Sequence, residues 1–329
     1  MTDPDSRQAP VPVTILSGFL GAGKTTLLQR LLTDPQGRRF GVLVNDFGAI
    51  NIDAALIVEA GSDQVSLANG CICCTIKDDL VAAARQLLAN SPPPDHLIVE
   101  TSGVSRPLAV IEALEELEAA ARLESVFCVV DATGFLALDF AATELAIEQA
   151  VCADIVLLNK CDIASPAEIE AAETSLTGIL PQARILHTRF AEAPRGLLFE
   201  PPLEPAALKL ALHDHDHATC GHDHHHDHGE EFESWSWQSA EALDEAAFLQ
   251  AVRQMPPALL RIKGVLRIAG HPAQRGIYQR VGTRGGLDFD AHPAPAVSEL
   301  VAIGRRGSFD AEALTTLLAG CVSGGNGAA

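Results

Sequence analysis

The sequence predicts an α/β protein, in which a doubly wound, mostly parallel sheet is followed by a smaller α+β C-terminal domain. Short apolar runs of strand length recur along residues 1–190, with helical patterns between them. Several of these runs end in polar or glycine-rich motifs, as the carboxyl ends of parallel strands do where they form a ligand site. At 329 residues, the chain is also long enough for about two domains.

The first motif, at residues 18–25, reads G-F-L-G-A-G-K-T and matches the phosphate-binding loop G-x-x-x-x-G-K-[ST]. An apolar run at residues 11–16 predicts a strand before it, and leucines at helical spacing predict a helix after it. A loop between strand and helix presents unpaired N–H groups to a polyphosphate, which favours a P-loop NTPase over a glycine-rich turn without a ligand. The residues expected to bind the nucleotide here are Gly18, Gly21, Ala22, Gly23, Lys24, Thr25 and Thr26.

Composition argues against several classes of protein. The net charge is -20 and no basic run is present, so we expect no nucleic-acid partner. No apolar stretch approaches membrane-spanning length, and the N-terminus lacks the basic and apolar parts of a signal peptide, which predicts a cytoplasmic protein with no membrane partner. In that compartment, the eight cysteines are more typical of metal or redox chemistry than of disulfides.

A second apolar run, at residues 40–44, leads into Asn45-Asp46-Phe47-Gly48. In P-loop proteins, a mobile loop in this part of the chain approaches the terminal phosphate and its magnesium ion. Asp46 and Asp53 are therefore candidates for carboxylates that face this metal. The alternative interpretation is that both are exposed acids in a turn.

Three cysteines, Cys71, Cys73 and Cys74, lie within four residues, just before a helix predicted at residues 78–88. Such a cluster can turn several thiolates toward one ion, and thiolates suit zinc or copper(I). Three thiolates leave one tetrahedral position open, which favours an exchangeable metal over a structural one. The alternative is three small, buried hydrophobic side chains. The remaining cysteines that we interpret as packing or surface residues are Cys128, Cys152, Cys161 and Cys321.

The apolar run at residues 97–99 ends in Glu100-Thr101-Ser102-Gly103, and Pro107 opens the next predicted helix. A carboxylate at the carboxyl end of a strand beside the phosphate loop can hold magnesium, so Glu100 and Thr25 are the candidate magnesium ligands. Gly103 can offer its N–H group to the γ-phosphate.

Two further apolar runs, at residues 126–130 and 155–158, lead into Asp131 and into Asn159-Lys160-Cys161-Asp162. We expect Asp131 to cap the following helix. The second motif is an N-K-x-D tetrad, in which the aspartate accepts from guanine N1 and N2, the asparagine meets the O6 and N7 side, and the lysine stem covers the ring. Adenine would leave the aspartate unpaired. Together with the phosphate loop, the tetrad predicts a GTP site in which Asn159, Lys160 and Asp162 contact the base.

These motifs together resemble a CobW-type metallochaperone GTPase, a group related to the nickel-insertion GTPases of hydrogenase and urease and including zinc chaperones. The resemblance rests on the phosphate loop, Asn45-Asp46-Phe47-Gly48, Cys71-Ile72-Cys73-Cys74, Glu100-Thr101-Ser102-Gly103 and the N-K-x-D tetrad, and it covers nearly the whole chain. It implies a P-loop GTPase domain at residues 1–190 and a CobW C-terminal-like domain at residues 231–329. The implied cofactors are GTP, Mg²⁺ and Zn²⁺, with Co²⁺ as an alternative metal. The implied partner is a metal-dependent client protein, and a homodimer is a further expectation.

Residues 191–230 are expected to form a linker, which begins with a proline-bearing stretch at residues 194–205. From 213 to 228 the linker consists mainly of histidine and aspartate. These side chains can hold zinc, cobalt or nickel loosely in many combinations, which predicts a disordered metal collector, whereas the alternative is a merely solvated linker. The candidate ligands are His213, His215, His217, His222, His224, His225, His226 and His228.

The C-terminal domain is predicted to be a small α+β module. An alternating pattern at residues 233–237 indicates a strand, and a helical pattern follows near residues 243–252. Strand-like pieces lie at residues 260–268, 277–281 and 300–303, and Asp310 is expected to cap a last helix. The module carries no catalytic constellation, and the family resemblance implies a role in contacting the client.

The predicted activity is GTP hydrolysis coupled to release of a metal held by the three clustered cysteines. Lys24, Thr25 and magnesium would offset charge on the transferred phosphoryl group, and Asp46 or Glu100 are the candidates for orienting water. Three other functions fit the sequence. They are a GTP-responsive metal buffer without transfer, a cobalt or iron insertase for cobalamin synthesis or a nitrile-hydrating enzyme, and an ATP-using kinase.

Overall fold

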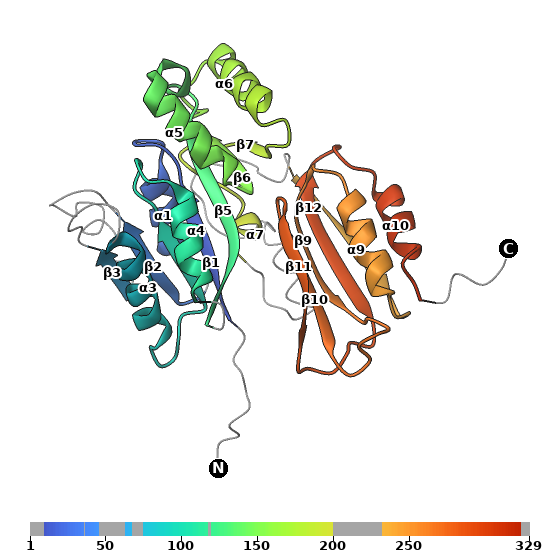
Figure 1. Ribbon diagram of the computed structural model, residues 1–329. Helices are drawn as coiled ribbons and strands as arrows, with labels where there is room; N and C mark the ends of the chain where they lie inside the picture. The colour runs from blue at the N-terminus through green and yellow to red at the C-terminus, as the bar shows by residue number, and fades with distance from the viewer. Residues whose placement is uncertain are drawn as a thin grey trace, which may run out of the picture. The chain divides into compact units, whose positions relative to one another are not determined.

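The computed structural model describes residues 10–35, 37–45, 63–67, 75–117, 120–199 and 232–323. Its contacts divide the chain into two compact units, Met1–Ala193 and Pro194–Ala329. Each unit has its own sheet, drawn in blue to yellow-green for the first and in orange to red for the second (Figure 1).

The first unit is built on a seven-stranded sheet with the order β3-β2-β4-β1-β5-β6-β7, in which every neighbouring pair is parallel. The strands are β1 (Val11–Ser17), β2 (Phe40–Asn45), β3 (Asp63–Leu67), β4 (His96–Glu100), β5 (Ala121–Asp131), β6 (Ile155–Asn159) and β7 (Ile185–His187). The helices are α1 (Lys24–Thr33), α3 (Thr75–Leu88), α4 (Pro107–Glu115), α5 (Phe140–Val151) and α6 (Pro166–Ile179), with a short 3-10 helix, η2 (Phe135–Ala137).

Strand β1 lies between β4 and β5, and the direction of the crossovers reverses there. Because crossovers between parallel strands are right-handed, α1 lies on one face of the sheet and α3 to α6 on the other. Two apolar clusters fill the second face: α3 and α4 pack on β1, β2, β4 and β5, while α5 and α6 pack on β5 and β6. The carboxyl ends of β1 and its neighbours meet at this reversal, which is where doubly wound sheets bind ligands.

The predicted fold class is confirmed, and so are the five strands predicted in this unit, which are β1, β2, β4, β5 and β6. Strand β5 begins at Ala121 rather than at Val126, and α3 begins at Thr75 rather than at Asp78. Pro107 occupies the start of α4 as predicted. Strands β3 and β7 and helix α6 are additions, and β7 has only three residues, too few to give a pattern.

The second unit has a five-stranded antiparallel sheet with the order β11-β10-β9-β12-β8. Helices α9 and α10 pack on one face of this sheet around an apolar cluster that includes both tryptophans (Figure 1). The strands are β8 (Phe232–Ser239), β9 (Leu259–Leu266), β10 (Arg275–Val281), β11 (Arg284–Asp290) and β12 (Ser298–Arg305), and the helices are α7 (Arg195–Leu198), α9 (Glu245–Gln254) and α10 (Ala311–Ala319).

The helix ends of this unit follow from side-chain caps. Asp310 accepts hydrogen bonds from the backbone N–H groups of Glu312 and Ala313, which confirms the predicted cap of α10. Asp244 caps α9 in the same way, so that helix begins at Glu245 and runs slightly later than the pattern indicated.

The stretch predicted as a linker contains the short helix α7 near its start. Leu197 and Leu198 are fully buried there, and the guanidinium of Arg261 on β9 donates to the Leu197 carbonyl oxygen at 3.0 Å. These contacts tie residues 195–199 to the second unit. Residues 195–199 of the predicted linker are therefore packed, while the linker itself stays a prediction, since residues 200–231 lie outside the described residues.

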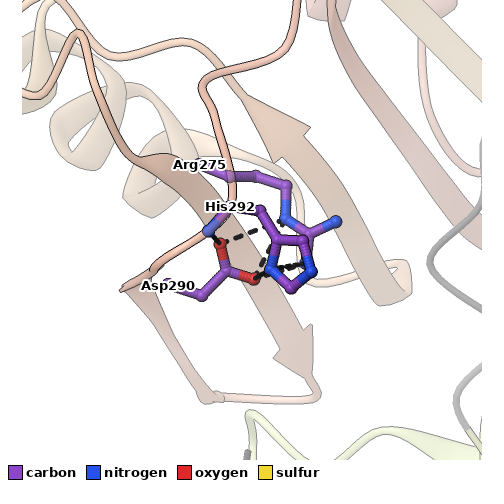
Figure 2. Close-up of polar contacts among 3 residues, drawn as sticks. All are labelled: Arg275, Asp290 and His292. Atoms are coloured by element: carbon purple, nitrogen blue, oxygen red, sulfur yellow. Dashed lines mark hydrogen bonds and ion pairs between the residues drawn. The ribbon is translucent and has the colours of Figure 1, made fainter. Parts of the chain in front are cut away.

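The hairpin of β10 and β11 turns at Gly282, whose φ of 56° lies in the left-handed region. At its open end, Arg275 forms hydrogen bonds with Asp290, and the backbone N–H of His292 donates to Asp290 Oδ1 at 3.0 Å (Figure 2). Partial burial acts to raise the pKa of Asp290, but these hydrogen bonds and the charges of Arg275 and His292 outweigh it, so the pKa lies below its usual value. The ionised carboxylate thereby holds the ends of the two strands together.

Candidate functional site

The phosphate loop connects β1 to α1, and three glycines give it its shape. Gly18, Gly21 and Gly23 have φ values of 135°, 70° and 114°, all in the region that residues with a side chain rarely adopt. A Cβ atom on Gly18 would lie 2.1 Å from the Val129 carbonyl oxygen, and one on Gly23 would lie 2.4 Å from Asn159 Nδ2. Packing therefore requires glycine at both positions. A backbone curved in this way can point successive N–H groups at a phosphate.

Lys24 and Thr25 begin helix α1 beside this loop. Lys24 is 7% exposed, and its Nζ donates to the Phe19 carbonyl oxygen at 3.1 Å, so the ammonium lies within the loop. Thr25 Oγ1 donates to Glu100 Oε1 at 2.7 Å, because β4 lies next to β1 in register Leu16 to Glu100. Thr26 lies in the same first turn, exposed to solvent.

The Thr25 and Glu100 pair fits a magnesium ion chemically. Hydroxyl and carboxylate oxygens are the ligands that Mg²⁺ takes in nucleotide sites. The structure thus brings together Thr25, in the first turn of α1, and Glu100, at the end of β4, which were paired as candidate magnesium ligands from the sequence.

The segment after Glu100 packs directly on the phosphate loop. A Cβ atom on Gly103 would lie 2.7 Å from the backbone nitrogen of Leu20. Gln149 on α5 is fully buried, and its Nε2 donates to the carbonyl oxygens of Gly103 and Ser105 at 3.1 and 3.0 Å. Gln149 is thus a positioning residue that the sequence analysis missed. The available signal was a glutamine on the same helical face as the buried Ala146 and Ala150.

Asn159 joins three loops at the carboxyl edge of the sheet. Its Nδ2 donates to the Ala22 carbonyl oxygen at 2.9 Å, while its Oδ1 accepts from Thr188 Oγ1 at 3.1 Å and from the Ala191 backbone N–H at 2.7 Å. The N-K-x-D pattern predicts that this amide contacts guanine. Because its oxygen and one of its hydrogens bind protein groups, we assign Asn159 first to holding the phosphate loop against the loop after β7.

Lys160 and Asp131 form an ion pair, with Nζ 2.6 Å from Asp131 Oδ2. Asp131 Oδ1 also accepts from the backbone N–H and the hydroxyl of Thr133. Burial acts to raise the pKa of Asp131, but the hydrogen bonds from Lys160 and Thr133 outweigh it and hold that pKa below its usual value. The predicted helix cap is therefore wrong, since Asp139 caps α5 instead. Asp162, the last residue of the tetrad, is exposed.

Several predicted site residues lie outside the described residues. They are Asp46, Asp53, Cys71, Cys73, Cys74 and the eight histidines His213, His215, His217, His222, His224, His225, His226 and His228. Within the part of the chain that the structure describes, no group of three or more histidine, cysteine or acidic side chains could hold a metal ion.

The cysteines that the structure describes are all free thiols. Burial raises the pKa of Cys128 to about 12, so its thiol stays protonated at neutral pH. No helix in the described ranges combines the length and the apolar character needed to cross a membrane.

Comparison with known proteins agrees with this geometry. A family model described as the CobW/HypB/UreG nucleotide-binding domain matches residues 12–187, and a model of the cobalamin synthesis protein cobW C-terminal domain matches residues 232–322. The chain is 35% identical over 317 residues to the zinc chaperone CobW of Pseudomonas aeruginosa, which covers 86% of this chain and 83% of that protein.

Two other relatives match different shares of the chain. The zinc-regulated GTPase metalloprotein activator 1 of Dictyostelium discoideum is 34% identical over 223 residues, covering 56% of this chain and 47% of that protein, so the match spans about half of that relative. The crystal structure of Zn(II)-bound YjiA GTPase from Escherichia coli is 25% identical, with a TM-score of 0.46, and covers 95% of this chain and 99% of that one. Since the first family model covers more than half of the sequence, this chain belongs to the CobW/HypB/UreG family, with a CobW C-terminal domain attached, and is a GTPase.

Proposed function

We propose that this GTPase is a zinc metallochaperone, which holds zinc at Cys71, Cys73 and Cys74 and passes it to a client protein in a GTP-dependent step. The proposed binding of GTP is supported by one observation. The side-chain amide of Asn159, in the tetrad, forms hydrogen bonds with both the phosphate loop and the loop after β7. The zinc part is supported by the name of the Pseudomonas relative, which matches along most of both chains, and by the preference of clustered thiolates for zinc.

Different residues of this chain would have different roles in GTP hydrolysis. The glycine loop would bind the β- and γ-phosphates through backbone N–H groups, and the Lys24 ammonium would leave the Phe19 carbonyl oxygen for the phosphate. Thr25 and Glu100 would hold Mg²⁺, which supplies charge neutralisation at the phosphates. Asp46 or Glu100 would orient the attacking water. Gln149 keeps Gly103 against the phosphate loop, where its N–H group can meet the γ-phosphate.

The coupling between nucleotide and metal rests on the topology of the sheet. The chain segment with the three cysteines connects the carboxyl end of β3 to α3, and all strands of this sheet are parallel. It therefore leaves the sheet at the edge that carries the phosphate loop and Glu100. Loss of the γ-phosphate can thus reorder the loops of one edge together and change the hold on zinc.

Other parts of the proposal concern supply, delivery and location. The eight histidines of residues 213–228 would collect zinc loosely, or cobalt where it is present, and raise its concentration near the cysteines. The second unit would contact the client. The protein would act in the cytoplasm, as a monomer or homodimer, without a nucleic-acid or membrane partner.

Replacing Asp162 with asparagine tests guanine recognition. We expect the affinity for GDP to fall at least about 100-fold, because the guanine N1 and N2 hydrogens lose their acceptor. The affinity for xanthosine diphosphate should rise, since xanthine offers a carbonyl group where guanine has its amino group. Fluorescent nucleotide titration measures both.

The matched control is Asp139→Asn, which removes the same charge from the cap of α5. It should leave both nucleotide affinities unchanged. Equal loss of GDP affinity in the two variants would contradict a role of Asp162 in reading the base.

A further inference from the structure

Three residues other than glycine have positive φ in the part of the chain that the structure describes. They are Lys160, Phe190 and Ala191, with φ values of 64°, 52° and 54°. All three follow the carboxyl ends of two neighbouring strands, β6 and β7. A bulky side chain rarely adopts this conformation, and such residues persist where surrounding structure fixes them, most often at binding sites.

The loop after β7 is fixed on both sides of Phe190. The Thr188 backbone N–H donates to the Leu158 carbonyl oxygen at 2.8 Å, and the Cys161 N–H donates to the Thr188 carbonyl oxygen at 3.1 Å. On the other side, the Ala191 N–H donates to Asn159 Oδ1 at 2.7 Å. The tetrad thus holds this loop at Thr188 and at Ala191, the residues on either side of the Arg189-Phe190 pair.

The same loop touches the phosphate loop. Ala191 is fully buried, and a Cβ atom on Gly23 would lie 3.8 Å from the Ala191 Cβ. Phe190 therefore stands where the phosphate loop, the tetrad and the loop after β7 meet, which is the place a guanine base must occupy if Asp162 reads it.

Burial in the core does not explain the phenyl ring, since Phe190 is 56% exposed while its neighbour Ala191 is 0% exposed. Glycine would adopt the same φ without strain, and a polar residue would suit the exposure. The chain instead presents an aromatic ring at the rim of a site that must bind a planar base. Aromatic rings bind bases by stacking, and stacking accepts any base because every base has a π face.

We propose that the phenyl ring of Phe190 covers one face of the guanine base, opposite the stem of Lys160, and supplies affinity rather than base selectivity. This inference rests on the proposed reading of guanine by Asp162. Asp162 would select guanine by accepting hydrogen bonds from the edge of the base, whereas Phe190 would stack on the face of any bound base. The two residues therefore have separable effects on the dissociation constant.

Two substitutions in the full-length protein test this role. Phe190→Gly removes the ring and the backbone strain together. We expect the midpoint of thermal unfolding of the nucleotide-free protein to rise, whereas the dissociation constants of GDP and GTP increase about tenfold or more. A purely structural residue would not move stability and affinity in opposite directions.

Phe190→Trp keeps an aromatic ring and reports on stacking directly. We expect GDP affinity within about threefold of wild type and quenching of the new tryptophan on addition of GDP. The wild-type protein supplies the background, because its two tryptophans, Trp235 and Trp237, are buried in the second unit. Phe140→Gly is the control for losing an exposed phenylalanine, since Phe140 is 86% exposed at the start of α5, and GDP affinity should not change.

A GDP affinity within twofold of wild type in Phe190→Gly, or an unquenched tryptophan in Phe190→Trp with bound GDP, would overturn the inference. Failure of the proposed base reading would look different. In that case Asp162→Asn would leave the ratio of guanine to xanthine nucleotide affinities unchanged, whatever the Phe190 variants do.

Discussion

Replacing Lys24 with alanine is expected to lower kcat for GTP hydrolysis by about 100- to 1000-fold, the size of effect seen when one electrostatic donor to a transition state is removed. The ammonium is almost fully buried and already lies inside the glycine loop, 3.1 Å from the Phe19 carbonyl oxygen. When GTP binds, we expect the Lys24 ammonium to leave the Phe19 carbonyl oxygen and to donate to a phosphate oxygen, which gains negative charge during the reaction. Phosphate release under single-turnover conditions measures the effect on the chemical step.

The control for the lost charge is Arg30→Ala, which removes a cation from the last turn of the same helix. Arg30 lies 4.0 Å from Glu192 and is exposed, so the hydrolysis rate should stay within about twofold of wild type. Circular dichroism should show an unchanged fold in both variants. A Lys24→Ala enzyme as fast as Arg30→Ala would contradict the assignment of the phosphate loop as the catalytic cradle.

Replacing Gly18 with alanine is expected to destabilise the first unit by about 3 kcal/mol or more, through overpacking and backbone strain together. The added methyl group would lie 2.1 Å from the Val129 carbonyl oxygen, and that atom belongs to a strand and cannot move aside. For a unit of this size, the thermal midpoint should fall by about 6–12 °C. Thermal unfolding followed by circular dichroism measures it.

Gly21→Ala is the matched comparison within the same loop. Gly21 also has a positive φ, 70°, but an added Cβ would meet no atom within 4 Å. Its cost should be limited to the left-handed conformation of alanine, about 1 kcal/mol. If the two variants lost equal stability, the contact between Gly18 and Val129 would not be what requires glycine.

Strands β1, β2, β4, β5 and β6 of the first unit could be predicted because parallel strands that are buried on both faces have continuous apolar sequences. The motifs at their ends placed Thr25 and Glu100 together although 75 residues separate them. The sequence of strand β11 contains no continuous apolar run. It lies at the edge of its sheet, contains Gly285 and Gly286, and carries two aspartates, so its conformation depends on pairing with β10.

The residues that the sequence analysis missed act through tertiary contacts. Gln149 binds carbonyl oxygens more than 40 residues away, and Thr188 and Ala191 bind Asn159 across about 30 residues. No local pattern encodes these partners. The prediction for Asp131 was wrong for the same reason. An aspartate before a helix is typical of a cap, but the pairing of β5 with β6 brings the Lys160 ammonium close to Asp131. The Asp131 carboxylate therefore forms an ion pair with Lys160.

The central claim is that nucleotide state controls the hold on zinc, and zinc affinity measured in the two states tests it most directly. The measurement uses a protein that lacks residues 213–228, so that zinc bound by the histidines does not contribute. A chromogenic chelator competes with the protein for zinc. The competition is run with magnesium and either GDP or a non-hydrolysable GTP analogue. We predict that the two affinities differ, and that both are lost when Cys71, Cys73 and Cys74 are replaced with serine. Equal affinities with GDP and the analogue would contradict the account, because the metal would then be indifferent to the γ-phosphate.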